Sequence, residues 1–309
     1  MMKRVLVTGA TGFIGRHCLP LLLNKGYEVH AVTSQSSIDG FSDVHWQHCD
    51  LLDSEKVSAL MKEVKPTHLL HFAWVTAHGE FWTSLENLRW VRASFDLLEA
   101  FKKSGGLRGV VAGTCAEYDW QHGYCSERIT PIAPTTLYGI SKHSLQIMFE
   151  AFARQTGLSF AWGRIFFLYG PHEHPGRLVP SVICSLLQGE PTCCSHGNQI
   201  RDFLYVQDVA DAFVTLLERD VMGVVNIASG SPVFLKDIVY KIAEKLNRKA
   251  LLQFGDAYTS ASEPPLVVAD IRLLNNQVGW SPRFDLDQGL DQTITWWEKR
   301  LFEKNNNAK

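Results

Sequence analysis

Long apolar runs and an excess of charge are both missing from this sequence. No stretch of about 18 apolar residues occurs, so we expect neither a membrane-spanning helix nor a membrane partner. The first residues, MMKRVLVTGATGFIG, contain an apolar run too short for a signal peptide. A formal net charge of −2 gives no electrostatic reason to expect nucleic acid as a partner. With 309 residues, 46% of them hydrophobic, the chain can bury a sizeable globular core.

Cysteine and metal-ligand patterns are also sparse. The seven cysteines are an odd number, are scattered and include no Cys-x-x-Cys pair, which is typical of reduced thiols in a cytoplasmic protein. His172 and His174 lie close together, but no Cys or carboxylate cluster at metal-ligand spacing accompanies them. We therefore expect a cytoplasmic protein without a metal site.

Strand-like and helix-like patterns alternate through the first half of the chain. β-Branched and apolar runs predict strands at residues 4–8, 27–33, 67–73, 107–113 and 159–167. Apolar residues at helical spacing predict helices at residues 13–23, 54–64, 81–103 and 137–156, the second with Ser54 as its N-cap. This alternation predicts an α/β fold with a parallel sheet. From Tyr169 onward, prolines break the pattern into shorter elements, which predicts a smaller second lobe.

A glycine-rich turn joins the first predicted strand to the first predicted helix. Gly9, Gly12 and Gly15 form the sequence G-A-T-G-F-I-G, and a second strand follows about 20 residues later. Glycines at this spacing let the backbone approach a pyrophosphate, which then lies at the helix N-terminus. The alternative is a helix start that is merely rich in glycine. The pattern predicts a Rossmann-type doubly wound sheet that binds a dinucleotide. The predicted contacts from the turn are Gly9, Thr11, Gly12, Phe13, Ile14 and Gly15.

The end of the second predicted strand bears on the choice of coenzyme. An NAD site usually places a carboxylate there, but Thr33 and Ser34 occupy the position, followed by polar residues at 35–37. Without that negative charge, hydroxyl groups and Arg16 could bind a 2′-phosphate, which favours NADP(H) over NAD(H). Asp50 is a candidate for the adenine edge, with a helix-capping turn as the alternative. The remaining predicted coenzyme contacts are Leu51, Phe72 and Ala73.

A phenol and an ammonium group are spaced for one helix face. Tyr138 and Lys142 are four residues apart near the start of a predicted helix. A nearby cation favours the phenolate, so the phenol could exchange a proton with a sugar hydroxyl or ketone near neutral pH. Thr114 directly follows the strand at 107–113, at the sheet edge where ligands bind. We predict that Thr114 hydrogen-bonds the reacting oxygen, with a plain strand-end residue as the alternative.

Several motifs in order point to a known family. The chain resembles the extended short-chain dehydrogenase/reductases of the NAD(P)-dependent sugar-nucleotide epimerase/dehydratase family, in the segments VLVTGATGFIGRH, HCDLLD, HFAW, GTCAEY, YGISKHSLQ, GRIFFLYGP, RDFLYVQDVADAF and VGWSPRFDLDQGL. Together with the pattern of strands, helices and prolines, this predicts a Rossmann domain over residues 1–168 and a mostly substrate-binding lobe over 169–309, some segments of which return to the sheet. The resemblance also implies a nucleotide-sugar substrate, and a homodimer formed through the helices at 81–103 and 137–156.

The same resemblance assigns roles to single residues. Thr114, Tyr138 and Lys142 would form the catalytic triad, with Lys142 also on the nicotinamide ribose. Arg201 would bind the substrate diphosphate, although the bare sequence equally allows a surface ion pair with Asp202.

Three departures from the family pattern narrow the reaction. Dehydratases carry Asp-Glu after the catalytic Thr, where this chain has Cys115 and Ala116, and these are poor substitutes for the acid and base. The family's 3,5-epimerase/reductases carry a Cys at the place of Ala116 and a His near the place of Arg177. An Asn that often contacts the substrate is replaced by Phe167. The predicted substrate contacts are Thr114, Cys115, Ala116, Phe167, Arg177 and Arg201.

Simple hydride and proton exchange at a sugar carbon remains. Together with NADPH, this predicts reduction of the C4 ketone of a nucleoside-diphosphate 4-keto-6-deoxyhexose, a step of deoxysugar biosynthesis. An NAD-dependent nucleotide-sugar 4-epimerase is the alternative that needs the same residues. An alternative of another class is a non-catalytic redox sensor that binds a dinucleotide, although such proteins typically lack the Tyr-Lys pair.

Overall fold

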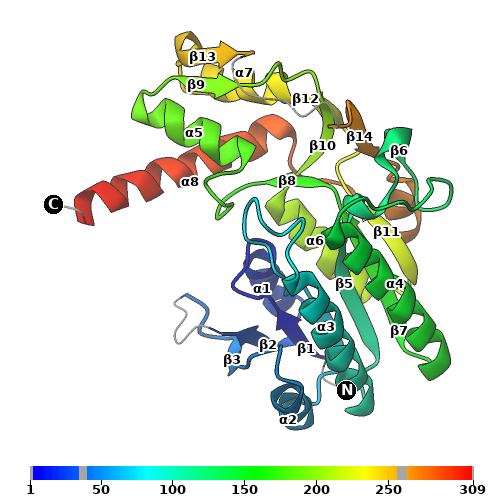
Figure 1. Cartoon of the computed structure of the whole chain (residues 1–309). Helices are drawn as coiled ribbons and strands as arrows, with labels where there is room; N and C mark the ends of the chain where they lie inside the picture. Colours follow the sequence, from blue (N-terminus) through cyan, green and yellow to red (C-terminus); the bar gives the residue numbers. More distant parts are fainter. Residues whose placement is uncertain (1–2, 35–39, 256–262, 308–309) are drawn as a thin grey trace.

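A seven-stranded parallel sheet forms the centre of the molecule. The computed structural model describes residues 3–34, 40–255 and 263–307, with side chains described up to residue 303. The strands are β1 (Arg4–Thr8), β2 (Glu28–Thr33), β3 (His45–His48), β4 (His68–His71), β5 (Arg108–Thr114), β7 (Ser159–Ile165) and β11 (Gly223–Ile227). Their order is β11-β7-β5-β4-β1-β2-β3, and every neighbouring pair is parallel (Figure 1). The carboxyl ends of these strands therefore meet at one edge.

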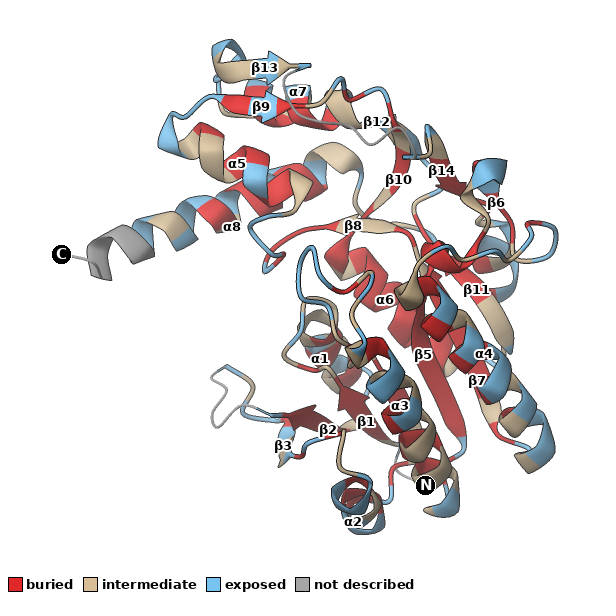
Figure 2. Cartoon of the chain, in the orientation of Figure 1, coloured by how far each residue is buried: buried red, intermediate tan, exposed pale blue. Residues whose placement is uncertain are grey.

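Helices cover both faces of this sheet. They are α1 (Gly15–Asn24), α2 (Ser54–Val64), α3 (Glu86–Lys103), α4 (Leu137–Thr156) and α6 (Val206–Glu218). The helices α1 and α6 pack on one face, and α2, α3 and α4 pack on the other. Because side chains alternate along a strand, Val5 and Val7 of β1 join one core while Leu6 joins the other. Figure 2 shows the strands buried and the outer helix faces exposed. The predicted α/β doubly wound fold is confirmed.

Two helix starts differ from the sequence prediction. The helix α2 begins at Ser54, but its N-cap is Asp53, whose carboxylate accepts hydrogen bonds from two N–H groups of the first turn. The helix predicted from residue 81 begins only at Glu86. Phe81 is buried instead, and its ring packs edge-on against the ring of Tyr138. A tertiary contact therefore outweighs the helical pattern, and residues 72–85 form a long connection beside the sheet.

A second layer lies beyond the carboxyl ends of the parallel strands (Figure 1). Its strands are β6 (Tyr124–Cys125), β8 (Phe167–Tyr169), β10 (Ile200–Tyr205), β12 (Pro232–Phe234) and β14 (Leu266–Ala269). Their order is β12-β10-β14-β6, and β8 also pairs with β10. Each layer thus contains a strand from the other side of residue 168: β6, which precedes residue 168, belongs to the second layer, and β11, which follows it, belongs to the large sheet. The division of the chain at residue 168 stays a prediction.

The remaining elements pack against this second layer. They are α5 (Leu178–Gln188), α7 (Leu235–Lys245), α8 (Leu286–Asn307) and the pair β9 (Thr192–Cys194) and β13 (Leu252–Phe254). Short helical segments lie at Cys115–Glu117, Trp120–His122, Lys249–Leu251 and Leu274–Val278, and the last of these packs beside β11 in the core of the large sheet. Within the described ranges, no helix has both the length and the apolar character needed to cross a membrane.

Candidate active site

The glycine-rich turn is packed so tightly that two of its glycines admit no side chain. Gly9 has a φ of +65°, and a Cβ there would lie 2.8 Å from the backbone nitrogen of Ala73. A Cβ at Gly15 would overlap the carbonyl oxygen of Gly9. The glycines therefore let the backbone of the turn pack closely on Ala73 and on itself, while Phe13 and Ile14 line the space in front of it. These residues fit a dinucleotide pyrophosphate, whose approach to the start of α1 a side chain would block.

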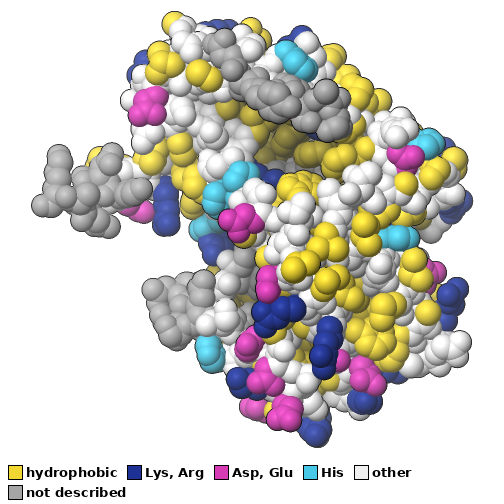
Figure 3. All heavy atoms as spheres, viewed as in Figure 1, with side chains coloured by type: hydrophobic (Ala, Val, Ile, Leu, Met, Phe, Trp, Pro, Cys, Tyr) yellow, Lys and Arg dark blue, Asp and Glu magenta, His cyan; other side chains and the backbone are white. Residues whose placement is uncertain are grey.

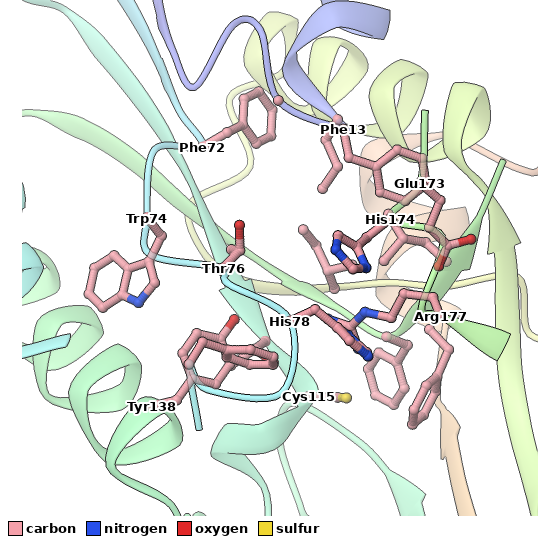
Figure 4. Close-up of a pocket in the computed structure, with 18 of the residues that line it drawn as sticks. Phe13, Phe72, Trp74, Thr76, His78, Cys115, Tyr138, Glu173, His174 and Arg177 are labelled. Atoms are coloured by element: carbon pink, nitrogen blue, oxygen red, sulfur yellow. The ribbon is translucent and has the colours of Figure 1, made fainter. Parts of the chain in front are cut away.

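A cavity of about 460 Å³ opens in front of this turn. Figure 4 shows its wall, with Trp74 and Tyr138 on one side and Glu173 and Arg177 on the other. The predicted site residues that line the cavity are Gly9, Gly12, Phe13, Ile14, Gly15, Phe72, Ala73, Thr114, Cys115, Tyr138, Phe167 and Arg177. The predicted dinucleotide-binding turn and the predicted reaction centre therefore share one space.

Tyr138 is the second residue of α4 and lies beside the strand end that carries Thr114. The helix starts sharply there because Thr136 caps it, accepting a hydrogen bond of 3.1 Å from the N–H of Gly139. The Tyr138 ring packs edge-on against Phe81, with 4.9 Å between the ring centres. Burial raises the pKa of Tyr138, and a hydrogen bond with the Thr114 hydroxyl opposes this rise. In the chain without a coenzyme, the pKa of Tyr138 is therefore raised, and the lowering that the sequence analysis expected from a nearby cation is wrong.

Lys142 lies one helical turn further along α4, behind the cavity wall. Only 3% of the residue is exposed, and its Nζ donates a hydrogen bond of 2.9 Å to the carbonyl oxygen of Ala112. The same atom lies 3.8 Å from the centre of the Trp74 ring. Burial lowers the pKa of Lys142 to about 7, and the carboxylate of Glu117 opposes this shift. At neutral pH the amine is therefore close to the midpoint of its titration.

A buried carboxylate that the sequence analysis missed holds Thr114 in place. Glu117 is fully buried, and its Oε1 accepts hydrogen bonds of 2.9 Å from the backbone N–H of Thr114 and from the indole of Trp162. Its Oε2 accepts a bond of 2.7 Å from the guanidinium of Arg164, which is also buried. Thr114 and Glu117 have the three-residue spacing of a capping box, and this spacing could have indicated from the sequence that the two residues interact.

The predicted adenosine contacts lie away from this cavity. Thr33 is buried at the end of β2, Ser34 is exposed, and residues 35–37 lie outside the described residues. The guanidinium of Arg16 donates to the carbonyl oxygen of Thr11 at 2.6 Å and contacts the ring of His172. The carboxylate of Asp50 accepts a hydrogen bond of 3.0 Å from the N–H of Leu52, but the N-cap of the following helix is Asp53, and the adjacent Leu51 is buried.

The predicted substrate residues fall into two groups. Cys115 and Phe167 line the cavity, and burial raises the pKa of the Cys115 thiol, which therefore stays neutral. Ala116 and Arg201 are buried and do not line it. The Arg201 guanidinium lies 5.3 Å from the centre of the Phe167 ring and forms an ion pair of 3.0 Å with Glu263.

Arg201 does not form the alternative ion pair with Asp202 that the sequence allowed. The carboxylate of Asp202 instead accepts hydrogen bonds from Ser229 and from the backbone N–H of Gly230. The alternation of a strand explains this result, because neighbouring residues of β10 point to opposite faces of its sheet.

Several cavity residues were not among the predicted site residues. Aromatic side chains form much of the wall, namely Trp74, Phe81, Trp82, Trp120, Phe166 and Phe203. Glu173 and His174 line it from the loop before α5. The rings of His78 and His174 stack at 4.9 Å, yet the described residues contain no group of three His, Cys, Asp or Glu side chains suited to a metal. The aromatic content of residues 72–85 and 114–136 was the only available signal, and it cannot show which rings face inward.

Comparison with known sequences settles the family. A sequence model of the NAD dependent epimerase/dehydratase family matches residues 5–228. The chain belongs to this family. It is 27% identical over 323 residues to UDP-glucuronic acid decarboxylase 1 of Xenopus tropicalis, and the alignment covers 99% of this chain and 74% of the relative.

Two solved structures show the same fold at comparable identity. MoeE5 in complex with UDP-glucuronic acid and NAD superposes with a TM-score of 0.83 at 31% identity, covering 96% of this chain and 99% of the other. The NAD complex of UDP-glucose 4-epimerase from Thermus thermophilus gives 0.82 at 26% identity, with the same coverage. The suspected family and its enzymatic character are confirmed, since the family and these relatives are NAD-dependent sugar-nucleotide enzymes.

The predicted preference for NADP(H) is wrong. Both of these solved relatives contain NAD. The error has a physical reason, since the missing carboxylate after β2 removes a repulsion but supplies no attraction for a 2′-phosphate. Arg16, the cation proposed for that role, is engaged by the Thr11 carbonyl and by His172.

Proposed function

We propose that this protein is an NAD-dependent 4-epimerase of a nucleoside-diphosphate hexose. The observation that carries the proposal is the shared cavity, which places the glycine-rich turn, Thr114 and Tyr138 around one space. The residues after Thr114 are Cys115 and Ala116, so the acid and base of a dehydratase are missing beside the reacting carbon. The reductase interpretation depended on NADPH. With NAD, the redox-neutral reaction is the better match.

The residues of this chain support one proton relay. Tyr138 takes the proton of the sugar C4 hydroxyl while the C4 hydrogen leaves as hydride, and Thr114 hydrogen-bonds the oxygen that becomes a carbonyl. NAD would be held by the glycine-rich turn and would accept and return that hydride. Burial raises the pKa of the Tyr138 phenol. A protonated Lys142 and the positive charge of a bound oxidised coenzyme would both lower it. Once the keto sugar had turned over in the cavity, the coenzyme would supply hydride to the opposite face of C4, and Tyr138 would return the proton to the C4 oxygen.

The aromatic wall favours a second candidate with the same chemistry. Beside Tyr138 the cavity is lined by Phe81, Trp82 and Trp120, and these rings offer a C6 substituent little hydrogen bonding. An apolar C6 methyl group suits this wall, which is the feature of a 4-keto-6-deoxyhexose. The second candidate is therefore reduction of such a ketone, with NADH as the hydride donor.

Two assays on the purified protein separate these functions. Incubation with UDP-glucose, UDP-glucuronic acid or UDP-N-acetylglucosamine, without added coenzyme, should yield the C4 epimer by NMR, and denatured protein should release NAD. Consumption of added NADH with a CDP-, GDP- or dTDP-linked 4-keto-6-deoxyhexose, without epimerisation of the UDP sugars, would replace the epimerase by the reductase. Turnover in neither assay would refute both.

An exposed apolar surface on α3 and α4 supports a homodimer, which we also propose. Leu88 is 54% exposed and Ile147 is 52% exposed, and Ile140 and Met148 are exposed with them. Figure 3 shows hydrophobic side chains gathered over these two helices. A second copy of the chain would cover this surface. Light scattering should give twice the chain mass of 34.8 kDa, and Leu88→Glu with Ile147→Glu should halve it. A monomeric wild type would contradict the dimer.

A further inference from the structure

Glu173 has no part in the proposed hydride transfer, yet it lines the same cavity. The residue is only 9% exposed, and its Oε2 has no hydrogen-bond partner. The loop places it there, because the Glu173 N–H donates to the carbonyl oxygen of Gly170 at 3.3 Å. Buried polar atoms nearly always have a partner, so this carboxyl, with one buried oxygen unpartnered on a residue that lines the cavity, has hydrogen-bonding capacity left for a bound group.

Two helix starts adjoin Glu173 in the cavity wall. Gly12 and Phe13 line the cavity at the start of α1, and Leu178 and Val179 line it as the first residues of α5. No side chain caps α5, and the third residue of α5 is a proline, which has no N–H to satisfy. Backbone N–H groups at helix starts carry partial positive charge and bind phosphates.

The Arg177 guanidinium adds a full positive charge on the same wall. Figure 4 shows Arg177 and Glu173 on the same side of the cavity. Arg177 lowers the pKa of Glu173, but burial has the larger effect and raises this pKa to about 8. At pH 7 the side chain is therefore mostly the neutral acid, which has an O–H to donate. An ionised carboxylate would cancel the positive field of the helix starts, whereas the neutral acid adds a donor to it.

We propose that Glu173, as the neutral acid, donates a hydrogen bond to a ligand diphosphate, the group that NAD and nucleotide sugars share. The ligand classes rest on the proposed function, but the wall itself is built from the residues described above. Ionisation of Glu173 would replace this donor by a negative charge beside the diphosphate. Affinity for the diphosphate should therefore fall as the pH rises through the titration of Glu173.

Other titrating groups surround this loop and must be separated from Glu173. The pKa values of His78 and His172 are lowered by burial and by neighbouring cations, so these two rings are neutral above pH 7. Lys142, on the far side of the cavity, loses its proton near pH 7. A comparison with Glu173→Gln isolates the carboxyl, because the amide keeps a donor and cannot ionise. The charged and titratable side chains near the loop include Arg16, His17, His78, His172, His174, Arg177 and, from α8, Arg300.

The experiment measures binding, so that no turnover is required. Isothermal titration at pH 6.5, 7.5 and 9 uses NAD and UDP-glucose as separate probes, on protein freed of copurified dinucleotide. For a donor with a pKa of about 8, the protonated fraction falls about tenfold between pH 7 and pH 9. The affinity of the wild type should therefore fall about tenfold over this range relative to that of Glu173→Gln. Glu173→Gln should bind within about twofold of wild type at pH 6.5, whereas Glu173→Ala should bind about tenfold more weakly.

The two probes assign the site, and the controls can overturn it. A pH-dependent difference with NAD alone identifies the coenzyme diphosphate, and one with UDP-glucose alone identifies the substrate diphosphate. Glu80→Gln changes an exposed carboxylate on the neighbouring loop and should follow wild type at every pH. Parallel pH curves for wild type and Glu173→Gln with both probes would overturn the proposal. A wild type that shows this pH dependence without any sugar-nucleotide turnover would refute the proposed function alone.

Discussion

The two walls of the cavity are built in different ways. On the sheet side, Thr114 lies at the end of the buried strand β5 and Tyr138 in the first turn of α4, and Glu117 ties Thr114 to the neighbouring strand. On the opposite side, Glu173 and Arg177 lie on a loop before α5, and Glu173 has an oxygen without a partner. Groups that transfer protons need fixed positions, whereas groups that distinguish ligands can vary on a loop. We expect substitutions on the sheet side to affect turnover, and those on the loop side to affect binding.

The largest effect is expected at the phenol. Tyr138→Phe keeps the ring that packs on Phe81 but removes the proton donor, so turnover should fall about 10³-fold. The affinity for NAD should stay within about twofold, since the turn that would hold the pyrophosphate is untouched. Steady-state kinetics with the active sugar nucleotide, and titration with NAD, check the two halves. Near-native turnover in this variant would remove Tyr138 from the mechanism.

The next largest effect is expected at Glu117, whose buried carboxylate holds the backbone of Thr114. Glu117→Gln leaves the buried guanidinium of Arg164 without its anion, which should lower the free energy of unfolding by about 3 kcal/mol. Turnover should fall as well, because the backbone N–H of Thr114 loses a charged acceptor. Denaturant unfolding and kinetics measure these changes.

Two companion variants show whether the loss belongs to this ion pair. In Glu117→Gln/Arg164→Met the unpaired charge is gone, so part of the stability should return. Glu86→Gln breaks an exposed pair with Arg89 and should cost less than about 0.5 kcal/mol. If the single variant at residue 117 unfolds like wild type, the buried network does not support the site as described.

The sheet side was also the side that the sequence predicted best. Gly9 and Gly15 have a backbone reason to be glycine, and Tyr138 with Lys142 has a helix reason for its spacing, so local chemistry was enough. Features that depend on segments far apart in the sequence were not predictable in the same way, although Arg177 on the loop side was predicted to contact the substrate. The inward turn of Phe81, the ion pair of Arg201 with Glu263 and the burial of Glu173 all depend on segments far apart in the sequence. The NADP(H) error had partly the same origin, because the contact of Arg16 with His172 joins segments far apart in the sequence.

A smaller effect should appear as a pH dependence of stability from Lys142. Its pKa is about 7 in the folded chain and near 10.5 when unfolded, so between these values the unfolded chain carries a proton that the folded chain lacks. The contribution of this group to stability therefore rises with pH across that window, and its burial cost is complete below pH 7. Unfolding of wild type and Lys142→Met at pH 6.5, 8 and 9.5 should give a difference that grows by up to about 1.4 kcal/mol per pH unit. Parallel stability curves for the two proteins would show that folding does not lower the pKa of Lys142.

The smallest effect is expected at Cys115, which tests whether every group on the sheet wall takes part in proton transfer. The thiol lines the cavity next to Thr114, but burial raises its pKa and keeps it neutral, so it is a poor acid and a poor base there. Cys115→Ala removes one buried sulfur and should change turnover by less than about threefold, with a modest loss of stability. Kinetics across pH 6 to 9 provide the check, since a catalytic thiol would remove one limb of the pH profile when deleted. A loss of a hundredfold or more would mean that Cys115 transfers a proton, and the chemistry would then extend beyond exchange at a single carbon.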